Sequence, residues 1–226
     1  LGAILAVVVM FFHKLNPFSP SKSSRQKDAT WALWIKIIIA CVPAAILGLL
    51  LDDWMEAHLF NAYVVAAALI VYGVLFIVLE NSSVCTNPRF NKVGQISAKT
   101  AFLIGTVQLL ALIPGTSRSG STILGAMVLG CSRAAAAEFS FFLGIPVMFG
   151  ASLLKIVKYF LAGNVFTGPQ IFYTVLGMLI AFVVSIYSIQ FLMSYVRKHD
   201  FKFFGYYRII LGVIVLAYFG ITALAS

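Results

Sequence analysis

Long apolar runs separated by short charged connectors dominate the chain. A bilayer core about 30 Å thick needs roughly 20 apolar residues, since an α-helix rises about 1.5 Å per residue. Residues 1–12 are typical of the tail of a further span. The pattern predicts an all-α polytopic membrane protein forming one integral membrane domain over residues 1–226, with spans at about 33–51, 61–79, 134–158, 171–196 and 203–224.

Composition excludes the other broad classes of protein. Hydrophobic residues make up 62% of the chain and charged residues 10%, whereas a soluble domain carries about 25% charged residues. Disordered chains are poor in apolar residues and rich in charge, so disorder is excluded as well. The net charge of +9 comes from bases in short connectors, as in membrane-protein loops, and we expect no nucleic-acid partner.

The charge of the connectors predicts the orientation. Connectors 13–30, 80–99 and 197–202 are rich in Lys and Arg, while residues 52–58 contain acids and no Lys or Arg. Because cytoplasmic loops collect Lys and Arg, we expect the three basic connectors on the cytoplasmic side of the membrane. Residues 52–58 are expected to form a loop on the outer side. Cys41, Cys85 and Cys131 show no metal-like spacing, and we assign them no chemistry.

Two shorter apolar stretches, 100–113 and 121–131, do not fit a simple crossing. If Lys99 and Arg133 lie on the same side, these stretches form a hairpin that enters the membrane and returns, with its turn at 114–120. Irregular backbone at that depth is tolerated only when it is buried in protein or lines a watery cavity. Two true crossings would give the same parity, so the sequence leaves both topologies open.

The predicted turn concentrates polar groups in an apolar region. Residues 114–122 read PGTSRSGST, with one guanidinium, five hydroxyls and two glycines. The planar fork of Arg118 suits phosphate oxygens, and glycines let backbone N–H groups approach a ligand. Ser119 or Ser121 is expected to cap a helix that begins near residue 121, whose positive end attracts anions. These features favour a phosphate-like ligand, although an ordinary turn with Arg118 paired to Glu138 or reaching the interface stays open.

Two further polar residues have two interpretations each. Glu138 is either a ligand or charge partner near Arg118, or a carboxylate in an early helical turn near the inner surface. Gln108 either forms a hydrogen bond between helices, which we favour, or faces the ligand.

Several motifs resemble one known family. QLLALI at 108–113 followed by PGTSRSGST is similar to the second signature of the bacterial undecaprenyl-diphosphate phosphatase family, the bacitracin-resistance type. Residues 132–146 and the opening LGAILAVVV resemble that family too. The resemblance implies hydrolysis of the polyprenyl diphosphate carrier to a monophosphate and inorganic phosphate, which recycles the carrier for cell-wall peptidoglycan synthesis. It also implies a multi-pass protein of the bacterial inner membrane, an active site opening to the outer face, and a divalent cation, Mg²⁺ or Ca²⁺.

The resemblance also assigns roles to residues of the turn. Arg118 would clamp the diphosphate and stabilise charge on the transferred phosphoryl group. Ser117, Ser119 and Thr122 would donate hydrogen bonds to the phosphate oxygens, which with Arg118 gives the expected catalytic set, and Gly115 and Gly120 would shape the loop. Together with the residues weighed from the sequence, the expected substrate-binding set is Gly115, Thr116, Gly120, Ser121, Glu138 and Gln108.

The chain departs from the family at its start. The first signature, a Glu-rich helix followed by a Pro-x-Ser-Ser-x-Gly-His turn, would precede Leu1. The cation ligands are therefore expected there, and this chain is expected to lack full activity. The two signatures suggest an inverted repeat, of which Leu1-Gly2 and Leu143-Gly144 are a faint remnant. A transporter or flippase for an anionic polyprenyl lipid or phosphate is the alternative function, and a homo-oligomer stays open.

Overall fold

A computed structural model describes residues 1–82 and 87–225, which leaves Cys85 outside the described residues. In these ranges the chain is helical apart from its connectors and one isolated bridge. The helices are α1 (Gly2–Met10), α2 (Phe12–Leu15), α3 (Ser24–Leu59), α4 (Ala62–Asn81), α5 (Ala98–Val107), α6 (Arg118–Val128), α7 (Arg133–Leu161), α8 (Gly168–Val196) and α9 (Lys202–Ala225), with 3-10 segments η2 (Val93–Gln95) and η3 (Gln108–Leu112).

The five predicted spans are confirmed as long apolar helices. Within the described ranges, five helices are long and apolar enough to cross a membrane: Ser24–Gly48 of α3, α4, α7, α8 and Lys202–Thr222 of α9. The loop predicted at 52–58 is wrong, because α3 continues past Pro43 and remains helical to Leu59. The predicted partial span at 1–12 is two short helices, α1 and α2.

The two short apolar stretches form a helical hairpin, an arrangement that both of the topologies left open by the sequence share. Phe90, which precedes α5, pairs with Cys131, which follows α6. The Phe90 N–H donates to the Gly130 carbonyl at 2.9 Å, and the Ser132 N–H donates to the Phe90 carbonyl at 2.9 Å. The chain therefore enters and leaves the hairpin at the same end of the molecule, and the turn lies at the other.

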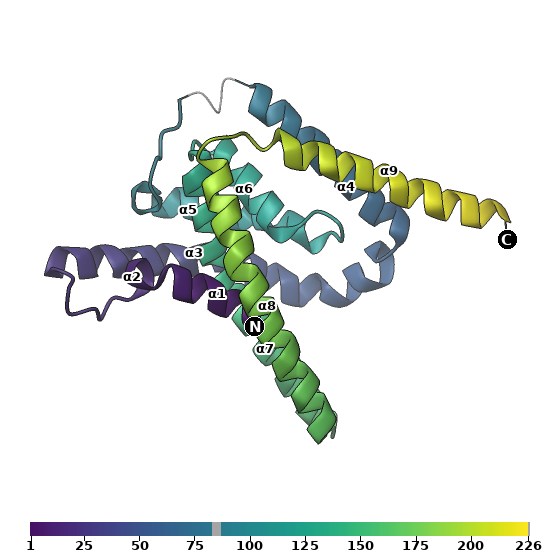
Figure 1. Ribbon diagram of the computed structural model, residues 1–226, viewed down its shortest axis with the longest axis horizontal. Coiled ribbons are helices and arrows are strands. Elements are labelled where there is room, and N and C mark those ends of the chain that lie inside the picture. The colour runs from purple at the N-terminus through teal and green to yellow at the C-terminus, as the bar shows by residue number, and fades with distance from the viewer. Residues whose placement is uncertain (83–86, 226) are drawn as a thin grey trace.

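The long helices surround this hairpin (Figure 1). α9 packs along α4, and α8 packs mainly on α1, which also contacts α7. Small residues permit the close approach of α4 and α9, since a Cβ at Gly73 would lie 2.7 Å from the Gly205 carbonyl oxygen. Such contacts are typical of helices in membranes, where packing rather than water exclusion holds helices together.

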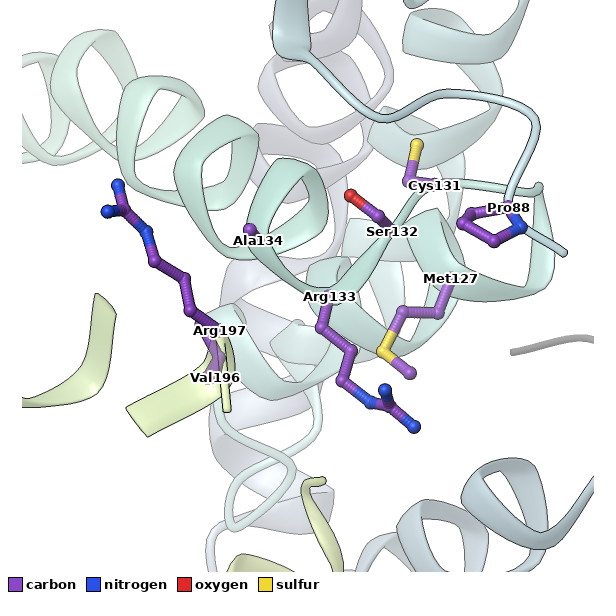
Figure 2. Close-up of a pocket in the computed structure, with 8 residues that line it drawn as sticks. All are labelled: Pro88, Met127, Cys131, Ser132, Arg133, Ala134, Val196 and Arg197. Carbon is purple, nitrogen blue, oxygen red and sulfur yellow. The ribbon is translucent and has the colours of Figure 1, made fainter. Parts of the chain in front are cut away.

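A buried ion pair ties the open end of the hairpin to α4 and α9. The Glu80 side chain is fully buried and accepts hydrogen bonds from Arg133 Nε at 2.9 Å and from the Phe201 N–H at 3.0 Å. Arg133 also lines a cavity of about 240 Å³ at this end, drawn in Figure 2. Glu80 is thus a structural anchor, although the sequence placed it among connector charges.

Removing this carboxylate should destabilise the fold. We expect Glu80→Ala to lower the free energy of unfolding by about 3 kcal/mol or more, because it removes the buried carboxylate that pairs with the Arg133 guanidinium. The control Lys202→Gln breaks an exposed pair with Asp200, 3.5 Å apart, and should cost at most about 1 kcal/mol. Denaturant unfolding of both variants in detergent measures the difference, and equal losses would refute the anchoring role.

Candidate functional site

The turn between η3 and α6 has two residues at positive φ. Gly115 has φ +93°, and a Cβ there would lie 2.5 Å from the Val65 carbonyl oxygen of α4. Ser117 has φ +66°, which is rare for a residue with a side chain and costs about 1–3 kcal/mol. Such strain persists only where the surrounding structure holds it in place.

Ser117 also caps α6. Its Oγ accepts a hydrogen bond from the Gly120 N–H at 3.3 Å, and the helix begins at Arg118. The prediction that Ser119 or Ser121 caps a helix starting near residue 121 is therefore wrong by about one turn. The consequence is that Arg118 is the first residue of the helix, where the helix dipole is positive.

Arg118 lies beside a cavity of about 180 Å³ between α1, α6, α7 and α8. Its Nη1 lies 3.5 Å from the Ser140 carbonyl oxygen, and its Nη2 lies 3.7 Å from Met148 Sδ. A Cβ on Gly144 would lie 2.6 Å from Nη2, so the guanidinium passes directly over this glycine of α7. Both polar contacts are long, which leaves the donors of Arg118 available to a ligand in the cavity.

Glu138 is not the partner of Arg118. Its Oε1 accepts a hydrogen bond from Lys14 Nζ at 2.7 Å. Glu138 precedes Gly144 by six residues of α7, and its carboxylate pairs with Lys14 of α2 instead. Of the two interpretations from the sequence, the structure places Glu138 in an early helical turn.

The hydroxyls of the turn divide into two groups. Ser117 and Ser119 stand 3.3 Å apart by their Oγ atoms, and Ser119 lines the cavity with Arg118. The other three, on Thr116, Ser121 and Thr122, are buried and are engaged within the protein. The Thr116 hydroxyl donates to the carbonyls of Leu110 and Ile113. The Ser121 hydroxyl donates to Tyr72 Oη and to the Ser117 carbonyl. The Thr122 hydroxyl donates to the carbonyls of Arg118 and Ser119. These three therefore shape the turn, whereas Ser117 and Ser119 remain to meet a ligand.

Gln108 is 3% exposed at the start of η3. Neither atom of its side-chain amide has a hydrogen-bond partner among the residues that the structure describes. The favoured interpretation, a hydrogen bond between helices, is therefore wrong.

The sequence reasoning missed Arg208 of α9. Its Nη2 donates to the Gly115 carbonyl at 2.7 Å and to the Thr116 carbonyl at 2.9 Å, while its guanidinium lies 5.7 Å from the centre of the Tyr72 ring. Its Nε is buried and has no partner in the described part of the chain. A charge within an apolar span is a signal of function, and Arg208 stands inside the predicted span 203–224.

The electrostatics of the site favour an anion. Arg118 opens α6 and Arg208 binds the carbonyls of the turn just before it, and in the described ranges no ion pair links either guanidinium to a carboxylate. Anions bind at helix N-termini because backbone N–H groups and the dipole point toward them. The site thus supplies the donors that a phosphate group needs.

A divalent cation does not fit these residues on their own. Residues 1–82 and 87–225 contain no group of three or more His, Cys, Asp or Glu side chains that could hold a metal ion. The turn itself offers hydroxyls and a guanidinium. The positive charge of the guanidinium repels a cation, and no carboxylate of the turn is there to bind one. Mg²⁺ or Ca²⁺ stays a proposal from the family resemblance.

Comparison with known proteins identifies the family. The family described as "Bacitracin resistance protein BacA" matches residues 1–214. The chain is 58% identical to the undecaprenyl-diphosphatase of Limosilactobacillus fermentum over 99% of this chain and 81% of that protein. It is 56% identical to that of Streptococcus thermophilus, over 96% of this chain and 76% of that protein, and 53% identical to that of Enterococcus faecalis, over 96% and 79%. The resemblance found in the motifs is confirmed, and the chain belongs to the BacA family of bacitracin resistance proteins.

Proposed function

We propose that this protein hydrolyses undecaprenyl diphosphate to undecaprenyl phosphate and inorganic phosphate, recycling the lipid carrier for cell-wall synthesis. The relatives that cover nearly the whole chain are named undecaprenyl-diphosphatases. The structural observation that carries the proposal is Arg118, held at the start of α6 beside a cavity and without a carboxylate partner among the described residues. The names of these relatives favour hydrolysis over the alternative function, a transporter or flippase.

The residues of the turn supply electrostatic stabilisation for this reaction. The reaction consumes one water: the bond from the terminal phosphorus to the bridging oxygen breaks, the electron pair of that bond stays on undecaprenyl phosphate, and the water oxygen ends on inorganic phosphate with its proton released to solvent. Negative charge shifts toward the bridging and terminal oxygens during this step. Arg118 donates to these oxygens as a planar fork, and Ser117 and Ser119 add hydroxyl donors from the same turn. Fixed donors of this kind cost no reorganisation during the reaction.

The walls of the cavity suit a lipid substrate. Beside Arg118 and Ser119 they consist largely of apolar side chains, including Ile4 and Val7 of α1 and Ile145 of α7. An apolar wall next to a cationic fork matches a molecule with a diphosphate head and a polyprenyl tail.

We also propose that the protein lies in the bacterial inner membrane with this site opening to the outer face. The basic connectors gather at the open end of the hairpin, where Lys92, Arg133 and Arg197 lie on the segments that flank it. Cytoplasmic loops carry the excess of Lys and Arg. The turn with Arg118 lies at the opposite end of the hairpin, which directs it toward the outer face.

Arg118→Ala tests the proposed function directly. Full-length protein, which includes the sequence before Leu1, purified in detergent and given undecaprenyl diphosphate with a divalent cation should release inorganic phosphate, and Arg118→Ala in that protein should abolish this release. Arg118→Lys should also fail substantially, because a point charge cannot replace the bidentate fork. Lys36→Ala is the control, since Lys36 Nζ donates to the Gly94 carbonyl at 3.0 Å, away from the turn. Lipid transport without phosphate release, or equal losses in the alanine variants, would refute the proposal.

Gly144→Ala tests the placement of the guanidinium over α7. A methyl group there would lie 2.6 Å from Arg118 Nη2 and would displace the guanidinium. A shift of about 1 Å at a reacting group can cost on the order of 100-fold in rate, so we expect a loss of that size in kcat. Gly150→Ala is the matched control on the same helix, because nothing lies within 4 Å of its Cβ position. The placement is wrong if both variants release phosphate at the parent rate.

Arg208→Gln tests the second guanidinium. The variant loses the charged donor to the Gly115 and Thr116 carbonyls, so the turn should relax and kcat should fall by about 10- to 100-fold. If Arg208 acts by positioning the turn, Arg208→Lys should restore part of kcat while KM changes little. A loss of thermal stability with normal kcat in the folded fraction would show a purely structural role.

A further inference from the structure

A second cavity lies at the open end of the hairpin, away from the turn. Its volume is about 880 Å³, and it is lined by the connector after α2, the first turns of α3, the η2 segment, the start of α7 and Arg197 after α8. Glu138 lines this cavity, and Gly144, over which Arg118 lies, is six residues further along α7. At about 1.5 Å per residue, the two sites are offset by roughly 9 Å along this helix.

Cations dominate the lining of this second cavity. Lys14, Lys22, Lys92 and Arg197 face one carboxylate, that of Glu138. This carboxylate is already paired with Lys14 at 2.7 Å. Within the described ranges, no ion pair neutralises the other three cations. They come from three separate parts of the chain, so the fold itself gathers this charge in one place.

One of these three cations, Lys22, is held against the wall of the cavity, while Lys92 and Arg197 are exposed. Lys22 Nζ donates to Thr30 Oγ1 at 2.9 Å and to the carbonyls of Asn16 at 2.8 Å and Lys14 at 3.3 Å, which holds its charge against the wall. Arg197 reaches past Ala134, and Figure 2 shows its guanidinium pointing away from that of Arg133. Arg133 is occupied by Glu80, so Arg197 is the guanidinium that faces this second cavity.

Aromatic side chains beside the cavity indicate the level of a membrane interface. Phe18 is 76% exposed and packs edge-on against Trp31, with ring centres 5.7 Å apart. Trp34 lies three residues further along α3, and its Nε1 donates to the Leu15 carbonyl at 2.8 Å. Tryptophan and other aromatic rings concentrate at the level of lipid headgroups. Basic pockets between membrane helices on the cytoplasmic side bind anionic headgroups.

We propose that this cavity binds the phosphate group of an anionic membrane lipid, such as phosphatidylglycerol, with Lys92 and Arg197 as its donors and the positive charge of Lys22 beside them. This site is separate from the turn that carries Arg118. It would hold the open end of the hairpin, where α3, α7 and α8 meet, against the headgroup layer.

The test uses the tryptophans beside the cavity as reporters. In a Trp54→Phe background, the fluorescence of Trp31 and Trp34 is followed while dioctanoyl phosphatidylglycerol is added to the protein in a neutral detergent. We expect saturable binding, and a Kd at least about tenfold higher in the double variant Lys92→Gln with Arg197→Gln. The matched control, Lys99→Gln with Lys198→Gln, removes the same charge from exposed residues outside the cavity and should leave Kd unchanged.

Three results would overturn the proposal. Equal loss of affinity in both double variants would mean that the lipid responds to overall charge. Dioctanoyl phosphatidylcholine binding as tightly as phosphatidylglycerol would mean that the cations do not select an anion. Inorganic phosphate binding with the same Kd and the same dependence on Arg197 would mean that the ligand is the free anion rather than a lipid. Unchanged helix content by circular dichroism shows that the double variants are folded.

Discussion

The structure depends on the placement of two guanidiniums at the positive end of one short helix. Arg118 opens α6, and Arg208 lies against the preceding turn from α9. In water this would cost little, but charge within a membrane is expensive unless it is paired or meets a ligand. No ion pair in the described ranges links either guanidinium to a carboxylate, and the proposed anionic substrate would complete the electrostatics of the site.

The rest of the turn serves to hold these donors in place. Ser117 adopts a strained positive φ, and its carbonyl accepts from the N–H and the hydroxyl of Ser121. Arg208 binds the two backbone carbonyls that precede Ser117, and the Thr122 hydroxyl binds the two that follow Ser117. The backbone strain is thus offset by hydrogen bonds on both sides, which keeps Ser117 and Ser119 beside Arg118. Fixed donors are what electrostatic stabilisation of a phosphoryl group requires.

Much of the fold could be predicted from the sequence because it follows from apolar length. Five spans and the hairpin are visible in the lengths of the apolar runs. The end of α3 could not be placed, since the acids at 52–58 are equally compatible with a loop and with a helix leaving the membrane. The role of Glu80 was also hidden, because its partners Arg133 and Phe201 are far away in the sequence.

The site was predicted by residue type but not by the work that each residue does. The sequence PGTSRSGST shows that the turn contains hydroxyls and a guanidinium. Only the structure shows that Thr116, Ser121 and Thr122 are buried and support the backbone, while Ser117 and Ser119 remain available to a ligand. The role of Arg208 could not be predicted because it is one charge in a long apolar run. Only the packing of α9 on α4 brings its guanidinium to the turn. Gly144 shows the same limit: its importance comes from the guanidinium that lies over it, so the absence of its side chain has meaning only once α6 and α7 are packed together.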